Sequence, residues 1–160
     1  PTGRLYRLRP GGQLDLLLGN VSSPNGVALS SDERVLYLAV TRGNAVWRVP
    51  LMDDGSVCKV GNFFTSYGPS GPDGLAMDAL GRLVVANPGL GCAWVLNHRA
   101  EPVWVVRSPL GASLTNVAFG GPDRQTLYCT ESVSGAVLRC ALDAPGLPLA
   151  MARSPDLQTA

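Results

Sequence analysis

Apolar residues occur along this chain in short runs, separated by clusters of glycine, proline, asparagine and serine. Examples are "VLYLAV" at residues 35–40, "RLVVAN" at 82–87 and "TLYCTE" at 126–131. No segment sustains the spacing of about 3.6 residues that an amphipathic helix requires. Turn clusters separate the runs at intervals of about 8 to 12 residues, which is typical of an all-β domain. We therefore predict an all-β fold with no long helix.

The runs also follow one another in a repeating order. A strand of small residues opens with an asparagine or aspartate, as in "PNGVAL" and "PDGLAM". A wholly apolar strand comes next, followed by one with a bulky residue and often an arginine, such as "AVWRVPL". Alignment on the first strand places Asn25, Asp73 and Asn116 at equivalent positions, about 45 residues apart. Four strands in a period of this length indicate the blades of a β-propeller.

This architecture explains the composition of each strand. The innermost strand lines a crowded channel, where glycine and alanine fit, and the second strand is apolar throughout because neighbouring blades cover both of its faces. A two-sheet sandwich is the structural alternative, but it gives no reason for a four-strand period. We expect a single partial propeller domain over residues 1–160, with about three and a half blades. These are a hairpin at about 3–20 and blades at about 21–66, 67–110 and 111–152.

Composition limits the kinds of partner and the cellular location that we expect for this protein. The chain has 160 residues, a net charge of +1 and 46% hydrophobic residues, which suits one domain-sized core. No basic run is interleaved with aromatic residues, so we expect no nucleic-acid partner. No uncharged apolar run approaches the roughly 18 residues that cross a bilayer, so we expect no membrane insertion. The chain opens on Pro1 without a signal-peptide pattern, so we expect a natural N-terminus elsewhere and a cytoplasmic protein.

The cysteines and the single histidine exclude several kinds of site. The four cysteines, Cys58, Cys92, Cys129 and Cys140, form no Cys-x-x-Cys pair, which disfavours metal knuckles and thioredoxin-like motifs. We expect reduced thiols in the core. His98 is the only histidine and lies in a polar stretch between two strands. A Ser-His-Asp triad would have to use this loop, and a zinc site with several histidines is excluded within the chain.

Other polar and aromatic residues have structural interpretations. Asp78 and Asp123 lie in turn-like contexts, so we expect them to cap hairpins. Trp47, Trp94 and Trp104 follow strand spacing, so we expect them to pack between blades.

Longer segments carry a family resemblance. "SSPNGVALSSDERVLYLAVTRGNAVWRVPL", "GPDGLAMDALGRLVVAN" and "TNVAFGGPDRQTLYCTES" resemble consecutive blades of the gluconolactonase and regucalcin (senescence marker protein) family. "GRLYRLRPGGQLDLLLGNV" resembles the hairpin that precedes them, so the likeness covers essentially residues 3–142. It implies the later half of a six-bladed propeller, with one divalent metal near the channel mouth. It also implies the hydrolysis of small lactones, which are sugar lactones in the best-known members.

The resemblance also implies roles for individual residues. Asn25 and Asp73 would be metal ligands, with Asp73 also the catalytic base. Asn116 is a weaker candidate for a contact with the substrate or with the ligands, and ordinary strand capping is its alternative. The family's other two protein ligands, a glutamate and an asparagine, come from preceding blades and have no match here. Oxygen ligands favour Ca²⁺, with Zn²⁺, Mg²⁺ and Mn²⁺ as alternatives.

A structural interpretation of the same motifs competes with the metal site. Asn-Gly is a strong turn signal, so Asn25 and Asp73 could do no more than start turns.

Three functions follow from this sequence. The first is a metal-dependent lactonase, in which activated water attacks the carbonyl of a small lactone and this chain carries part of the site. The second is a non-catalytic propeller that binds a partner, and the third is a scaffold similar to strictosidine synthase. An open propeller exposes apolar faces and unpaired strand edges. We therefore expect this chain either to belong to a longer protein or to self-associate.

Overall fold

The computed structural model describes residues 3–148, which form thirteen strands and one short 3-10 helix, η1 (Thr41–Gly43). The strands are β1 (Gly3–Leu8), β2 (Leu14–Val21), β3 (Pro24–Leu29), β4 (Val35–Val40), β5 (Ala45–Pro50), β6 (Gly61–Thr65), β7 (Leu75–Met77), β8 (Leu83–Asn87), β9 (Cys92–Leu96), β10 (Pro102–Arg107), β11 (Leu114–Gly120), β12 (Thr126–Glu131) and β13 (Ala136–Ala141). The predicted all-β class is confirmed. Across the described part of the chain, no helix has the length and apolar character needed to span a membrane.

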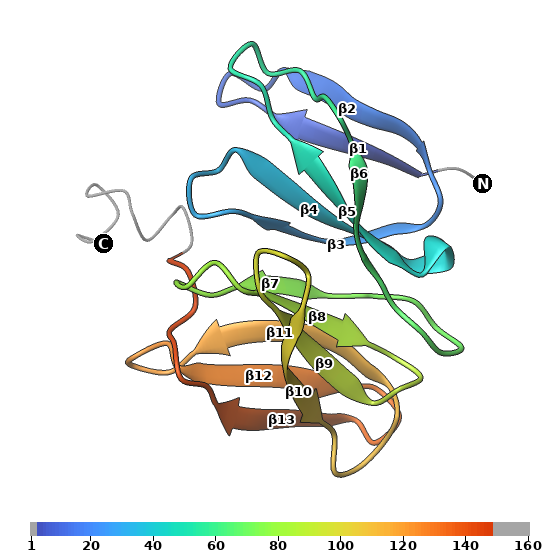
Figure 1. Ribbon diagram of the computed structural model, residues 1–160, viewed down its shortest axis with the longest axis vertical. Coiled ribbons are helices and arrows are strands. Elements are labelled where there is room, and N and C mark those ends of the chain that lie inside the picture. Colours follow the sequence, from blue (N-terminus) through green and yellow to red (C-terminus); the bar gives the residue numbers. More distant parts are fainter. Residues whose placement is uncertain (1–2, 149–160) are drawn as a thin grey trace.

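The strands form four antiparallel sheets in chain order: β1-β2, β3-β4-β5-β6, β7-β8-β9-β10 and β11-β12-β13. The sheets stack face to face, with the first two in the upper half of Figure 1 and the last two in the lower half. The first strands β3, β7 and β11 lie side by side, because β7 contacts both of the others. This is the arrangement of about three and a half propeller blades, with the first strands innermost. The last blade was expected to reach residue 152, and residues 149–152 lie outside the described residues.

Strand β4 shows why the second strand of a sheet is apolar on both faces. Leu38 and Val40 pack toward the β1-β2 hairpin, where they meet Val21. Tyr37 and Ala39 alternate with them and pack toward the next sheet. Successive side chains of a strand point to opposite faces, so a strand covered by two neighbours needs apolar residues at every position. The sequence-based explanation of these runs is therefore confirmed.

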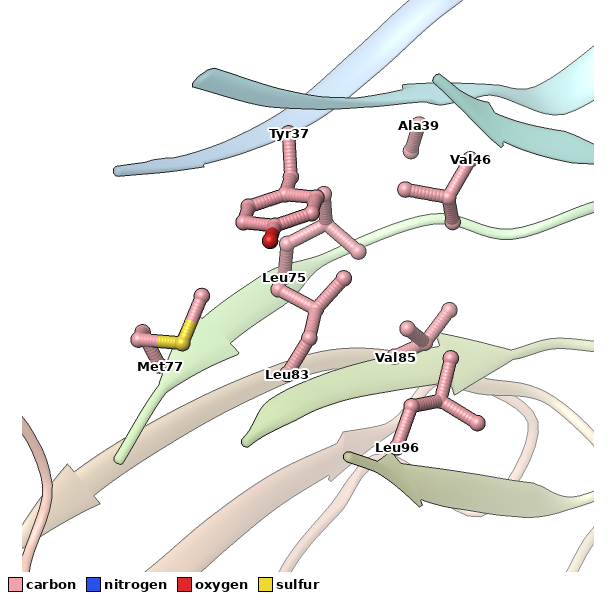
Figure 2. Close-up of a cluster of buried hydrophobic side chains, with 8 residues drawn as sticks. All are labelled: Tyr37, Ala39, Val46, Leu75, Met77, Leu83, Val85 and Leu96. Atoms are coloured by element: carbon pink, nitrogen blue, oxygen red, sulfur yellow. The ribbon is translucent and has the colours of Figure 1, made fainter. Parts of the chain in front are cut away.

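The interface between the second and third sheets is the core shown in Figure 2. Its buried residues come from both sheets: Tyr37, Ala39 and Val46 from one, and Leu75, Met77, Leu83, Val85 and Leu96 from the other. Val84 and Ala86 of β8 point the other way, into the interface with the last sheet. Burial of apolar surface stabilises by roughly 25 cal/mol per Å². These interfaces therefore set how the innermost strands lie relative to one another.

Two hairpins carry the predicted aspartate caps. Asp78 is fully buried, and its Oδ1 accepts hydrogen bonds from the backbone N–H groups of Leu80 and Arg82 at 3.0 and 2.8 Å. Asp123 accepts a hydrogen bond from the N–H of Gln125 at 3.0 Å in the turn between β11 and β12. Both residues act as turn caps, as the sequence predicts.

The segment after β13 ties the last sheet to the third one. The Arg82 guanidinium donates to Asp143 at 2.6 Å, and the N–H of Leu147 donates to the carbonyl oxygen of Met77 at 2.9 Å. Both contacts lie beside the turn between β7 and β8. The two sheets are therefore joined outside their apolar interface as well.

The three tryptophans do not share one environment. Trp47 and Trp94 pack against buried clusters between sheets, as predicted. Trp104 is 53% exposed on β10, so its predicted packing between blades is wrong. The reason is its strand, because β10 is the outer edge strand of its sheet. His98 is exposed in the turn between β9 and β10, as its polar context indicates.

Candidate functional site

A cleft of about 360 Å³ lies where β3, β7 and β11 begin. It is lined by Asn25, Gly26, Val27, Asp73, Gly74, Leu75 and Asn116. The structure thus brings all three predicted site residues to one place, each from a different sheet. Asn25 lies within β3, Asp73 just precedes β7 and Asn116 lies near the start of β11.

Asn25 and Gly26 lie inside a strand and do not form a turn. The backbone N–H of Gly26 donates to the carbonyl oxygen of Asp73 at 3.2 Å, across the boundary between two sheets. A Cβ on Gly26 would overlap that oxygen and lie 2.8 Å from the Leu75 nitrogen. Its φ is outside the left-handed region, so glycine is required here for close approach and not for a turn conformation. The turn interpretation of "PNG" is therefore wrong.

Gly74 repeats this arrangement one sheet further on. Its N–H donates to the carbonyl oxygen of Thr115 at 3.0 Å. A Cβ at Gly74 would overlap the Asn116 carboxamide oxygen and lie 2.7 Å from the Asn116 Cα. The two glycines let consecutive innermost strands touch backbone to backbone. The polar residue beside each glycine is therefore held at the same cleft.

Among the described residues that line the cleft, Asp73 is the only acidic one. Its N–H donates to the carbonyl oxygen of Ala86, and the Ala86 N–H donates to that of Gly74, both at 2.9 Å. The backbone is therefore fixed against β8. Partial burial raises the pKa of the Asp73 carboxyl, and a hydrogen bond from the Asn25 side chain offsets part of that rise. A carboxylate that has lost part of its hydration gains most from a nearby cation.

The Asn25 carboxamide is held from the side by Thr41, the first residue of η1. Its Nδ2 donates to the Thr41 hydroxyl at 3.2 Å, and that hydroxyl donates to the carbonyl oxygen of Pro72 at 2.8 Å. Thr41 was not among the residues predicted for the site. The only signal for it is its place directly after the apolar strand β4, since its partners lie 16 and 31 residues away.

Asn116 faces the cleft but already makes a local contact. Its Oδ1 accepts a hydrogen bond from the N–H of Val117 at 2.9 Å, near the start of β11. This bond occupies one lone pair of the carboxamide oxygen. The contact fits the capping role that sequence analysis left open, and a role toward the substrate stays a prediction.

The side-chain atoms at this cleft that could bind a metal ion are oxygen atoms. Between residues 3 and 148, no three or more His, Cys, Asp and Glu side chains are grouped so as to hold a metal ion. Zinc sites in proteins usually combine thiolate and imidazole ligands, and this cleft has neither. A carboxylate with carboxamide oxygens suits a hard cation such as Ca²⁺. Asn25 and Asp73 therefore fit part of the coordination shell of such an ion.

Comparison with protein families and characterised sequences points the same way. Residues 1–133 match the family described as SMP-30/Gluconolactonase/LRE-like region. The lactonase drp35 of Staphylococcus haemolyticus is 33% identical over 142 residues, covering 83% of this chain and 44% of that protein. The corresponding protein of Staphylococcus aureus strain COL is 34% identical over 115 residues, or 68% of this chain and 35% of the relative. The chain thus spans less than half the length of these relatives.

Solved structures share the fold. A structure assigned to the gluconolactonases superposes with a TM-score of 0.81 at 29% identity, covering 93% of this chain and 49% of that one. A structure described as a calcium-binding protein, regucalcin, from Agrobacterium tumefaciens gives a TM-score of 0.78 at 26% identity. It covers 93% of this chain and 58% of the other. Both alignments leave a large part of the longer chain without a counterpart.

Proposed function

Because the chain belongs to the SMP-30/gluconolactonase/LRE-like family, we propose that the whole protein hydrolyses small lactones at a divalent-metal site that includes Asn25 and Asp73. Relatives named lactonase and gluconolactonase support the reaction class. The observation that carries the proposal is the convergence of Asn25 and Asp73 from two sheets on one cleft. Sugar lactones are the substrates that we would test first.

The ligand types favour Ca²⁺ among the divalent ions. The carboxylate of Asp73 and the carboxamide oxygen of Asn25 would hold it, and both are hard donors. Calcium takes six to eight oxygen ligands, so the remaining ligands would include water, substrate and other parts of the whole protein. A bound divalent cation would supply a Lewis acid for the lactone carbonyl and for the attacking water.

Asp73 is the residue proposed to move a proton. In hydrolysis, a bond forms between the water oxygen and the lactone carbonyl carbon, and the ring C–O bond breaks. Asp73 would accept the water proton as the first bond forms, and the departing ring oxygen would finally receive a proton.

The experiment compares Asp73→Asn with the parent in the whole protein, using calcium titration and the hydrolysis rate of an aldonolactone. Asp73→Asn keeps the shape and one carbonyl oxygen but removes the charge and the base. We expect moderately weaker metal binding and a rate lower by about 10² to 10⁴, the usual contribution of general base catalysis. Asp123→Asn is the matched control, because Asp123 caps a turn and keeps its accepting oxygen.

The possible results separate the candidate functions. Loss of hydrolysis in Asp73→Asn with an unchanged Asp123→Asn supports the lactonase. A parent protein that binds calcium but hydrolyses no lactone points to the non-catalytic binding propeller. An Asp73→Asn variant with the parent's rate and metal affinity overturns the assignment of Asp73.

A further inference from the structure

Thr41 connects the segments that carry the two proposed metal ligands, Asn25 and Asp73, although it belongs to neither β3 nor β7. Its hydroxyl contacts the side chain of Asn25 on one side and the carbonyl oxygen of Pro72 on the other. Pro72 immediately precedes Asp73 in the chain. A single hydroxyl therefore links a neighbour of one proposed ligand with the side chain of the other.

The Thr41 backbone is itself held in place. Its N–H donates to the carbonyl oxygen of Ser23 at 3.1 Å, just ahead of β3. Its own carbonyl group packs against Gly71, where a Cβ would overlap the Thr41 oxygen and lie 2.8 Å from the carbonyl carbon. Gly71 thus lets the segment before Asp73 pass directly over Thr41. These contacts fix the backbone from which the hydroxyl reaches Asn25 and Pro72.

The direction of the hydrogen bonds decides which way the Asn25 carboxamide faces. A hydroxyl has one hydrogen to donate, and a backbone carbonyl can only accept. Because Thr41 gives its hydrogen to Pro72, its oxygen can only accept from Asn25. The NH₂ group of Asn25 must then face Thr41, and the same group supplies the hydrogen bond to Asp73. The carbonyl oxygen of Asn25 is directed away from Thr41.

We infer that Thr41 is a positioning residue that orients the Asn25 carboxamide with its oxygen available to a cation. The inference rests on the metal site proposed above. A freely rotating carboxamide would present its NH₂ group to the cation for part of the time, and an NH₂ group is not a ligand for a hard cation. Hydrogen-bonding partners of this kind typically change metal affinity by 10- to 100-fold.

The test measures calcium affinity by titration calorimetry, and kcat and KM for an aldonolactone, in the whole protein. Thr41→Val removes the hydroxyl at nearly constant shape, and we expect it to weaken calcium binding by about 10- to 100-fold. Thr41→Ser keeps the hydroxyl and should restore affinity to within about threefold of the parent. Thr65→Val is the matched control, since the Thr65 hydroxyl also accepts from an asparagine, Asn62, at 2.7 Å but on the outer strand β6. Its calcium affinity should equal that of the parent.

A double-mutant cycle separates positioning from a merely structural effect. In an Asn25→Ala background there is no carboxamide to orient, so Thr41→Val should change calcium affinity by less than about twofold. An equal loss in both backgrounds would mean that Thr41 acts only through the backbone at Pro72, and would overturn the inference. If Thr41→Val does not fold, Thr41→Ala removes the same hydroxyl and enters the same cycle.

The cycle also keeps this inference apart from the proposed function. If Asn25→Ala weakens calcium binding and Thr41→Val does not, the metal site stands and the positioning role is wrong. If Asn25→Ala binds calcium like the parent, Asn25 is no ligand, and the positioning role fails with it.

Discussion

Gly26 in β3 and Asp73 just before β7 are in direct backbone contact. The N–H of Gly26 donates to the carbonyl oxygen of Asp73 at 3.2 Å, which joins the second sheet to the third. The contact leaves no room for a side chain at Gly26. We expect Gly26→Ala to lower the free energy of unfolding by about 1 to 3 kcal/mol, because the new methyl group can only be accommodated by moving backbone. Urea unfolding of the whole protein measures this change.

The control for Gly26→Ala is Gly19→Ala. Gly19 lies in β2, its φ is not left-handed and a Cβ there meets no atom within 4 Å. The free energy of unfolding should change by less than about 0.5 kcal/mol, as for most surface substitutions. Equal effects at both glycines would mean that the contact between β3 and β7 is looser than described.

Removal of the metal should destabilise the whole protein if Asn25 and Asp73 hold it. A ligand at about 100 times its Kd stabilises the folded state by about 2.7 kcal/mol, so a calcium chelator should lower the Tm. Asp73→Asn should show a smaller chelator-induced shift, because it binds the ion less tightly. Differential scanning fluorimetry with and without chelator gives both values. A parent protein with the same Tm in both conditions would contradict the metal site.

Glu131 should make stability depend on pH. It is only 1% exposed, and its carboxylate accepts hydrogen bonds from the N–H groups of Ser113 and Ser134 at 3.0 and 2.6 Å. Hydrogen bonds from Ser134 in particular lower its pKa. The folded state therefore binds the proton less readily than the unfolded chain. The stabilisation is complete above the ordinary glutamate pKa of about 4.5, and it is lost as the pH falls through the lower folded value.

Thermal unfolding of Glu131→Gln across pH tests this. The variant should have a lower Tm than the parent near neutral pH, because the charge-assisted bonds are lost. The difference should shrink as the pH falls below about 4.5. Glu101→Gln serves as control, since Glu101 is exposed and accepts one bond from Asn97 in the turn between β9 and β10. A Tm difference that stays constant with pH would assign the effect to shape instead of charge.

The cysteines should differ in their reaction with iodoacetamide. All four are free thiols, and Cys129 is not directly opposite Cys140, because it pairs with Leu138. Burial raises the pKa of Cys129 to about 11, so on the order of one molecule in a thousand carries the reactive thiolate at pH 8. Burial also raises the pKa of Cys92. Cys58 is only partly buried.

Mass spectrometry of the native protein should show Cys58 modified first, with Cys92 and Cys129 modified only after unfolding. Alkylation of Cys129 as fast as Cys58 would contradict the core packing.

Much of the fold could be predicted because burial on two faces leaves a trace in the sequence. A strand such as β4 needs apolar side chains at both Leu38 and Ala39, and an unbroken apolar run records this need. Asn25 and Asp73 could be picked out because they recur at one point of the repeat. Trp104 was misplaced because strand spacing does not tell an outer strand from an inner one.

The role of the glycines could not be predicted from local sequence. Asn-Gly and Asp-Gly are turn signals through their own φ and ψ preferences, whereas Gly26 and Gly74 are required by strands far away in the chain. Thr41 was missed for a similar reason. Its hydroxyl has meaning only when Asn25 and Pro72 lie on either side of it, and a lone threonine after a strand does not indicate that.

The sheets β7-β10 and β11-β13 are tied at both ends. At the cleft, Gly74 meets Asn116, and at the far end the N–H of Leu147 bonds to Met77. Two plates joined along one edge can swing apart, but plates joined at opposite edges keep a fixed spacing. The part of the cleft between Asp73 and Asn116 therefore acts as a template of constant width.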